Sequence, residues 1–206
     1  MDFPVTDYFA LLDEPRRPWL EPEALKSKFL TLAAEAHPDK QNCASESEKL
    51  TANQRYAELN AAYHCLAEPK SRLLHLLELE LGKKPGDVQQ IPSALADLFA
   101  EVAATCRNAD AFLTEKTKAT SPLVQVQLFE CAQEWVERLH ALQTKLAGLH
   151  GRLIEELKSL DTLWLSNSQS GGQTALLNRL EELYCLFGYS NRWKNQIQER
   201  IVRLSL

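Results

Sequence analysis

Apolar residues recur with helical spacing along almost the whole chain of 206 residues, and no stretch alternates between apolar and polar residues as a strand would. The first predicted helix runs from Tyr8 to Leu12. The second begins at Pro22, where a proline at the first helical position removes no donor that the helix needs. It ends just before Pro38, because the residue before a proline is disfavoured in a helix. The pattern therefore predicts an all-α fold.

The C-terminal part of the chain predicts three long helices in series. The first begins near Pro92, the second spans residues 122–165, and the third follows a turn rich in Ser and Gly at residues 166–172. Leucines of the second helix keep near-heptad spacing, at positions 139, 142, 146, 149, 153, 157 and 160. Each helix has one apolar face that must be buried against the others. We predict a three-helix bundle with a long central helix over residues 92–206.

Residues 1–81 predict a smaller helical domain, joined to the bundle by a linker at residues 82–91. The linker is dense in turn-forming residues, with the sequence Gly82-Lys83-Lys84-Pro85-Gly86-Asp87. The smaller domain contains 14 acidic and 9 basic residues, whereas residues 82–206 contain 14 of each, so the net charge of −5 belongs to the smaller domain. A negative net charge argues against nucleic-acid binding.

Composition and short motifs exclude several classes of protein. No apolar run reaches the roughly 18 residues that a membrane helix needs, and the N-terminus lacks the pattern of a signal peptide. We therefore expect a cytoplasmic protein that does not enter a membrane. The 5 cysteines show no Cys-x-x-Cys spacing and predict free thiols. No metal, cofactor or catalytic residue is expected, because the histidines lack ligand partners at the right spacing.

After a polar stretch, Tyr56, Leu59 and Tyr63 recur at helical spacing and predict a third helix of the smaller domain. The connection between the second and this third helix carries the tetrapeptide His37-Pro38-Asp39-Lys40. Asp39 supplies a carboxylate suited to a bidentate bond with an arginine of a partner. Pro38 restricts its own φ and removes a backbone donor, so that His37 and Asp39 are held at a set angle. His37 can donate across the loop or to the partner. The loop predicts an element that acts on another protein.

Four segments resemble, in this order and spacing, a J domain, which recruits and stimulates ATPase chaperones of the DnaK type. They are Asp7-Tyr8-Phe9-Ala10-Leu11-Leu12, His37-Pro38-Asp39-Lys40, Leu59-Asn60-Ala61-Ala62-Tyr63 and Glu68-Pro69-Lys70-Ser71-Arg72. With a three-helix bundle behind it and no Gly/Phe-rich region, the chain resembles the HscB (Jac-type) family of iron–sulfur co-chaperones. The opening Asp-Tyr-Phe motif and the run Pro69-x-x-Arg72-x-x-x-Leu76-Leu77 favour this family over a general DnaJ. The resemblance implies a co-chaperone that is not itself an enzyme.

The resemblance also implies which residues meet a DnaK- or HscA-type chaperone. They are the loop residues His37, Pro38, Asp39 and Lys40, and the basic residues of the helix before the loop, here Lys26 and Lys28. That face has few basic residues, because the positions that usually carry Arg, Lys or Gln hold Ala33, Ala34 and Glu35. Charges at the rim of an interface mainly set the association rate. We expect slow or weak docking with activation retained, although Lys26 and Lys28 also fit plain solvated charges.

In the HscB family the bundle holds the scaffold protein on which iron–sulfur clusters are built, through apolar and acidic residues of its first helix and an aromatic residue of its last. The positions that the resemblance implies are Leu98, Phe99, Glu101, Val102, Tyr184 and Cys185. The expected acidic run is replaced by Ala103-Ala104-Thr105-Cys106-Arg107, and Cys185 stands about where the aromatic residue is expected. An ordinary core role for Leu98 and Val102, with only Phe99 facing outward, remains open.

Two further functions also remain open. A J protein whose bundle carries a different client fits the missing acidic run. A structural or assembly protein that keeps a weakened J domain fits the thin basic face and the acidic charge of residues 1–81. The pattern does not decide the oligomeric state or whether the long helix dimerises.

Overall fold

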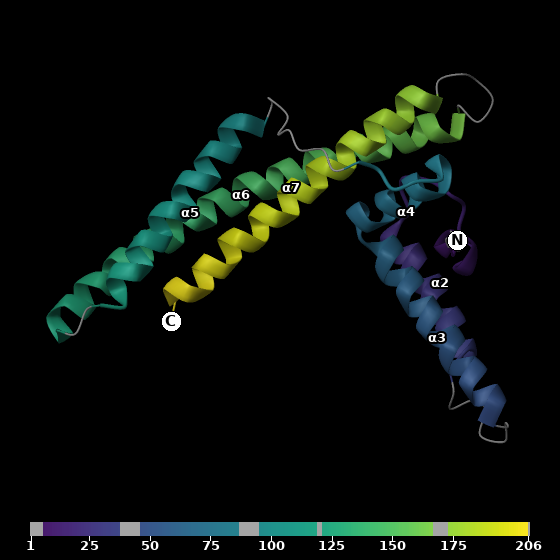
Figure 1. Cartoon of the computed structure of the whole chain (residues 1–206), viewed down its shortest axis with the longest axis horizontal. Coiled ribbons are helices and arrows are strands. Elements are labelled where there is room, and N and C mark those ends of the chain that lie inside the picture. The colour runs from purple at the N-terminus through teal and green to yellow at the C-terminus, as the bar shows by residue number, and fades with distance from the viewer. Residues whose placement is uncertain (1–5, 38–45, 87–94, 119–120, 167–172, 206) are drawn as a thin grey trace. The chain divides into compact units, whose positions relative to one another are not determined.

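The computed structural model describes residues 6–37, 46–86, 95–118, 121–166 and 173–205. These ranges contain helices and no strand (Figure 1), which confirms the predicted all-α fold. None of the described helices combines the length and apolar character that crossing a membrane requires. The elements are α1 (Tyr8–Leu11), α2 (Pro22–Glu35), α3 (Glu46–Ala67), α4 (Pro69–Leu81), α5 (Ala96–Lys116), α6 (Pro122–Ser166) and α7 (Gln173–Ser205).

The chain divides into two compact units. The first unit consists of residues 1–86 and 155–184, and the second of residues 87–154 and 185–206. The long helices α6 and α7 each contribute one part to the first unit and one part to the second. The first unit therefore contains the segment that resembles a J domain together with residues 155–184 of the predicted bundle, which come from the end of α6 and the beginning of α7.

In the first unit, α2 and α3 lie side by side as a helical hairpin (Figure 1), as the resemblance to a J domain implies. Leu25 of α2 and Leu59 of α3 are buried in its core. The rings of Phe29 and Tyr63 stack across the two helices, with their centroids 4.4 Å apart. This packing holds the end of α2, where His37 follows, against α3.

Each residue of the Asp7-Tyr8-Phe9 motif has a structural role in fixing α1. The Asp7 carboxylate accepts hydrogen bonds from the backbone N–H groups of Phe9 and Ala10, at 3.0 and 3.2 Å, and so caps the helix. The Tyr8 backbone N–H donates to Nε2 of His75 on α4, at 3.0 Å. Phe9 is fully buried. The motif thus joins α1 to α4.

The apolar pattern predicts that Pro69 interrupts the helical pattern and that a new helix spans Ser71–Leu81, but this helix begins two residues earlier, at Pro69. A proline at the first helical position lacks a donor that would have no partner there, so it starts α4 and does not interrupt it. The Glu68 carboxylate accepts a hydrogen bond from the Ser71 backbone N–H at 2.6 Å and caps the new helix. At the other end, Gly82 adopts φ of +66°, in the left-handed region that favours glycine.

Arg72 is the largest fully buried side chain of the first unit, at 2% exposure. Its Nε donates to the Pro18 carbonyl at 2.8 Å, and its Nη1 donates to the Leu66 carbonyl at 2.6 Å. These bonds join α4 to the loop before α2 and to the end of α3. Leu76 and Leu77 follow one turn later and are fully buried. The Pro-x-x-Arg-x-x-x-Leu-Leu run is therefore a core motif of this unit.

In the second unit, α5, α6 and α7 run alongside one another (Figure 1), which confirms the three-helix bundle. Side chains of the predicted leucine stripe of α6 are buried there, namely Leu139, Leu142, Leu146, Leu149 and Leu153. Arg200 of α7 joins α5 through an ion pair with Asp110, with 2.6 Å between Nη2 and Oδ2. The predicted long central helix is continuous from Pro122 to Ser166.

Candidate functional site

His37 directly follows α2 and is half-buried. Its ring meets the ring of Tyr56 on α3 edge to face, with the centroids 5.5 Å apart. Both rings line a shallow hollow of about 350 Å³, which Leu30, Ala33 and Ala34 complete. Leu30 is 55% exposed beside it. The other predicted loop residues, Pro38, Asp39 and Lys40, lie outside the described residues.

The two predicted basic residues of α2 differ in their surroundings. Lys28 is engaged within the unit: its Nζ lies 2.9 Å from Glu14 Oε1 and donates to the Asp13 carbonyl at 2.7 Å. Lys26 is exposed. Lys28 thus stabilises the turn after α1. Because its charge is paired with Glu14, α2 offers less positive charge to a partner.

The α2 surface next to His37 is mainly apolar. Ala33 is buried, while Ala34 and Leu30 are exposed. Glu35, two residues before His37, is also exposed. A partner that approached this face would meet methyl groups and an aromatic edge before it met a cation.

The residues predicted to hold a scaffold protein are only partly at the surface. Phe99 is 41% exposed and Leu98 is half-buried, but Val102 is 1% exposed and belongs to the bundle core. Glu101 is exposed, and its carboxylate forms an ion pair with Lys145 of α6 at 2.5 Å. The exposed apolar part of this face is therefore Phe99 with the edge of Leu98.

Two aromatic residues of α7 lie near Phe99 in the second unit: Trp193, which the sequence suggests only as a packing residue, and Tyr189, which it does not mark. The Phe99 and Trp193 ring centroids lie 6.1 Å apart, and those of Trp193 and Tyr189 lie 5.9 Å apart. Trp193 is buried and Tyr189 half-buried. In the sequence, the spacing of four residues between Tyr189 and Trp193 indicates that the two rings lie on the same face of the helix. We call Phe99, Tyr189 and Trp193 the aromatic cluster.

Tyr184 and Cys185, predicted to belong to the same surface, are assigned to different units. Tyr184 belongs to the first unit, where Lys70 Nζ lies 5.5 Å from its ring centroid. Cys185 begins the α7 part of the second unit. Both side chains are half-buried. Tyr184 therefore has a contact of its own within the first unit, through a residue of α4.

Asp161 of α6 is the centre of a polar junction within the first unit that the sequence did not reveal. This buried carboxylate binds both Nε and Nη2 of Arg17, the former at 3.0 Å. It also accepts a hydrogen bond from the Trp19 backbone N–H at 3.1 Å. One turn later, the Trp164 indole donates to the Arg16 carbonyl at 3.0 Å. The loop before α2 is thereby tied to the end of α6.

The Trp19 ring strengthens this junction, because two cations lie near it. Lys158 Nζ is 5.1 Å from the ring centroid, and Arg72 Cζ is 5.4 Å from it. Cations at such distances are attracted to the ring's negative face. Burial lowers the pKa of Arg72 to about 10, against the opposing effect of Glu68 and Asp161.

The buried imidazole of His75 makes the stability of the first unit depend on pH. Burial lowers the pKa of His75 below its ordinary value of 6.5, against the carboxylates of Asp7 and Glu78. Its neutral Nε2 accepts the Tyr8 N–H, and protonation would remove that acceptor. Because the unfolded chain binds this proton more readily, this contribution to stability is complete above about pH 6.5 and is lost as the pH falls through the folded-state pKa.

We therefore expect the free energy of unfolding of His75→Gln, whose amide oxygen still accepts, to vary less between about pH 6.5 and pH 5 than that of the wild type. Urea unfolding at several pH values measures this. His140→Gln, at an exposed position of α6, is the control and should keep the wild-type slope. An equal slope in all three proteins would contradict the role of His75.

No group of three or more His, Cys, Asp or Glu side chains in the described residues has the geometry to hold a metal ion. No family model matches the sequence. The structure is similar to the crystal structure of human co-chaperone protein HscB, with a TM-score of 0.58 and 19% identity, over 98% of this chain and 83% of that chain. It is also similar to chaperone HscB from Vibrio cholerae, with a TM-score of 0.57 and 21% identity, over 94% of this chain and 96% of that one. At these identities the likeness establishes the fold, and the predicted resemblance to HscB is confirmed at that level.

Proposed function

We propose that this protein is a J-type co-chaperone of the HscB kind, which stimulates the ATPase of a DnaK- or HscA-type chaperone and delivers a client to it. One observation carries the proposal: an HscB-like fold spans nearly the whole chain, with His37 directly after α2 of the helical hairpin. His37-Pro38-Asp39 thus occupies the connection between α2 and α3.

The proposed mechanism needs no catalytic group in this chain. Asp39 presents a carboxylate to an arginine of the chaperone, and a bidentate bond would fix the direction of approach. Pro38 restricts the backbone between His37 and Asp39. Binding that favours the hydrolysis-competent state of the chaperone shifts its population toward that state. ATP hydrolysis itself takes place in the partner.

Docking should depend only weakly on salt. Lys28 is paired with Glu14, and the α2 face beside His37 presents Leu30 and Ala34. Steering by long-range charge is screened by salt over roughly 8–10 Å, whereas apolar contact is not. The proposed complex therefore forms slowly and relies on short-range contact around the hollow.

For the client, we propose a scaffold protein that carries an iron–sulfur cluster as its cargo, bound on the α5 side of the bundle. The aromatic cluster supports this, because Phe99 is exposed while Trp193 beneath it is buried. An exposed aromatic ring backed by a packed one is a suitable anchor for a protein interface. Tyr189, half-buried beside Trp193, would extend this surface along α7.

Steady-state ATP hydrolysis by a purified DnaK-type chaperone tests the proposal. We expect the wild type to raise the rate and Asp39→Asn, which removes the charge, to reduce the stimulation at least tenfold. Glu130→Gln makes the same kind of charge change at an exposed position of α6 and should behave like the wild type. If the rate is the same without protein, with wild type and with Asp39→Asn, the structural or assembly role is favoured instead.

A J protein with a different client is the second candidate, and Glu101 favours it. Glu101 is exposed but already paired with Lys145, and the next positions to Arg107 carry no acid. A basic partner surface would find the exposed carboxylate of Asp97 there but no run of acidic residues. A pull-down with the full-length chain as bait separates the two candidates: recovery of a protein unrelated to cluster assembly, with no cluster scaffold, would support the second.

A further inference from the structure

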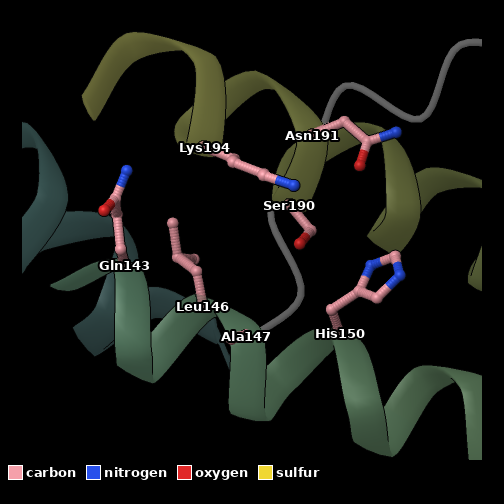
Figure 2. Close-up of a pocket in the computed structure, with 7 residues that line it drawn as sticks. All are labelled: Gln143, Leu146, Ala147, His150, Ser190, Asn191 and Lys194. Carbon is pink, nitrogen blue, oxygen red and sulfur yellow. The ribbon is translucent and has the colours of Figure 1, made fainter. Parts of the chain in front are cut away.

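A cavity of about 370 Å³ lies between α6 and α7 within the second unit. Seven residues line it: Gln143, Leu146, Ala147 and His150 of α6, and Ser190, Asn191 and Lys194 of α7. Figure 2 shows Leu146 of α6 and Ser190 and Lys194 of α7 in the space between the two helices. Its size lies within the range typical of sites for small ligands. None of the functions considered above uses it.

Two side chains of α7, Ser190 and Lys194, bring hydrogen-bond donors to the cavity, and no Asp or Glu lines it. Ser190 is 3% exposed, and its hydroxyl points from α7 into the space between the helices (Figure 2). Within the described part of the chain, no hydrogen bond engages this hydroxyl and no carboxylate pairs with the Lys194 ammonium. The Ser190 hydroxyl and the Lys194 ammonium therefore both remain available to a ligand that enters the cavity.

The lining also restricts the chemistry of that ligand. No Asp or Glu lines the cavity, and Lys194 extends over it, so it does not suit a cation. The buried side chain of Leu146 and the exposed methyl group of Ala147 supply apolar surface on α6. A single ammonium and one hydroxyl match the two oxygens of a carboxylate, whereas a phosphate ordinarily attracts several cationic groups.

From these observations we propose that the cavity binds a carboxylate attached to a short branched or linear apolar chain. One carboxylate oxygen accepts from the Ser190 hydroxyl and the other pairs with Lys194, while the apolar chain lies on Leu146 and Ala147. The carboxylate is that of a small free acid or that of a Glu side chain in a docked protein. This inference stands apart from the proposed chaperone activity, because its test needs only this chain and the probe.

Titration of the full-length protein with isovalerate, followed by the backbone amide signals in ¹⁵N NMR spectra, tests the site. We expect shifts confined to residues around Ser190 and Lys194, with a Kd of about 1 mM, as befits a ligand of this size. Isovaleramide, which has the same shape and no charge, should not saturate the site. The blocked peptide acetyl-Leu-Glu-Leu-amide separates the sources: binding tighter than that of isovalerate indicates a protein side chain, and weaker binding indicates a free acid.

Two variants and a matched control keep the test decisive. Lys194→Gln should raise the Kd for isovalerate about fivefold, because the ammonium contributes a charged hydrogen bond that its exposure to water weakens. Ala147→Leu fills part of the cavity and should abolish the localised shifts without loss of helix. Arg192→Gln makes the same charge change at an exposed position of the same helix and should bind like the wild type. Equal affinity for isovalerate and isovaleramide, or wild-type affinity in Lys194→Gln, would overturn the proposal.

Discussion

Replacing Arg72 with alanine is expected to lower the free energy of unfolding of the first unit by about 4 kcal/mol. The guanidinium donates to the carbonyl oxygens of Pro18 and Leu66, and each buried carbonyl that loses its donor costs roughly 1–3 kcal/mol. The shortened side chain also leaves a cavity beside Trp19. Urea unfolding followed by circular dichroism measures the change, with each unit's transition fitted separately if two are resolved.

Two companion variants test whether the hydrogen bonds cause the loss. Burying the positive charge of Arg72 lowers the stability of the folded protein, and the same burial lowers the pKa of Arg72 to about 10. Arg72→Met keeps much of the volume and removes this cost, so we expect a smaller loss of about 2 kcal/mol. Arg55→Ala, at an exposed position of α3, should change stability by less than about 0.5 kcal/mol. A methionine variant as stable as the wild type would show that the two carbonyl bonds contribute no more than the burial of the charge costs.

Replacing Asp161 with asparagine is expected to cost about 3 kcal/mol. The neutral amide cannot hold Arg17 through two acceptor oxygens, and removal of one partner from a buried pair typically costs 3–5 kcal/mol. Partial exposure of Arg17 places the expected loss at the lower end of that range. The Trp19 amide, which donates to the same carboxylate, should exchange its hydrogen faster, together with the Trp164 indole.

Glu155→Gln is the matched control for Asp161→Asn. Glu155 lies on the same helix and within the same unit, but its pairing with Lys158 is at the surface. Such a pair contributes no more than about 1 kcal/mol. We expect wild-type hydrogen exchange at Trp19 in this control. Unchanged exchange at Trp19 in Asp161→Asn as well would mean that the carboxylate does not hold the loop before α2.

The sequence predicted the helices well because their signals are local. The stripe through Leu59 and the leucines from Leu139 to Leu153 repeat at helical spacing, and these side chains are buried where that repeat places them. The start of α4 differed by two residues, because Pro69 reads equally as a helix breaker or a first helical residue. The Glu68 cap decides between these two roles through a side-chain hydrogen bond.

Exposure of the candidate site residues was less predictable. Val102 and Phe99 are both apolar residues of one helix, yet one is 1% and the other 41% exposed. The difference depends on which face α7 covers, and a periodic pattern in α5 alone does not specify its neighbour. Likewise, a lysine at position 28 reads as a surface charge until the turn after α1 brings Glu14 to it.

By itself, the sequence determined the all-α class, the motif order and the loop with His37 between two paired helices, because each depends on neighbours a few residues apart. Only the tertiary structure decided that Arg17, Trp19 and Asp161 meet, that α6 and α7 are shared between two units, and that Ser190 opens into a cavity. Arg17 and Asp161 are 144 residues apart. Such contacts leave no periodic trace in a sequence, because they arise when separate helices bury their apolar faces and bring isolated polar residues together.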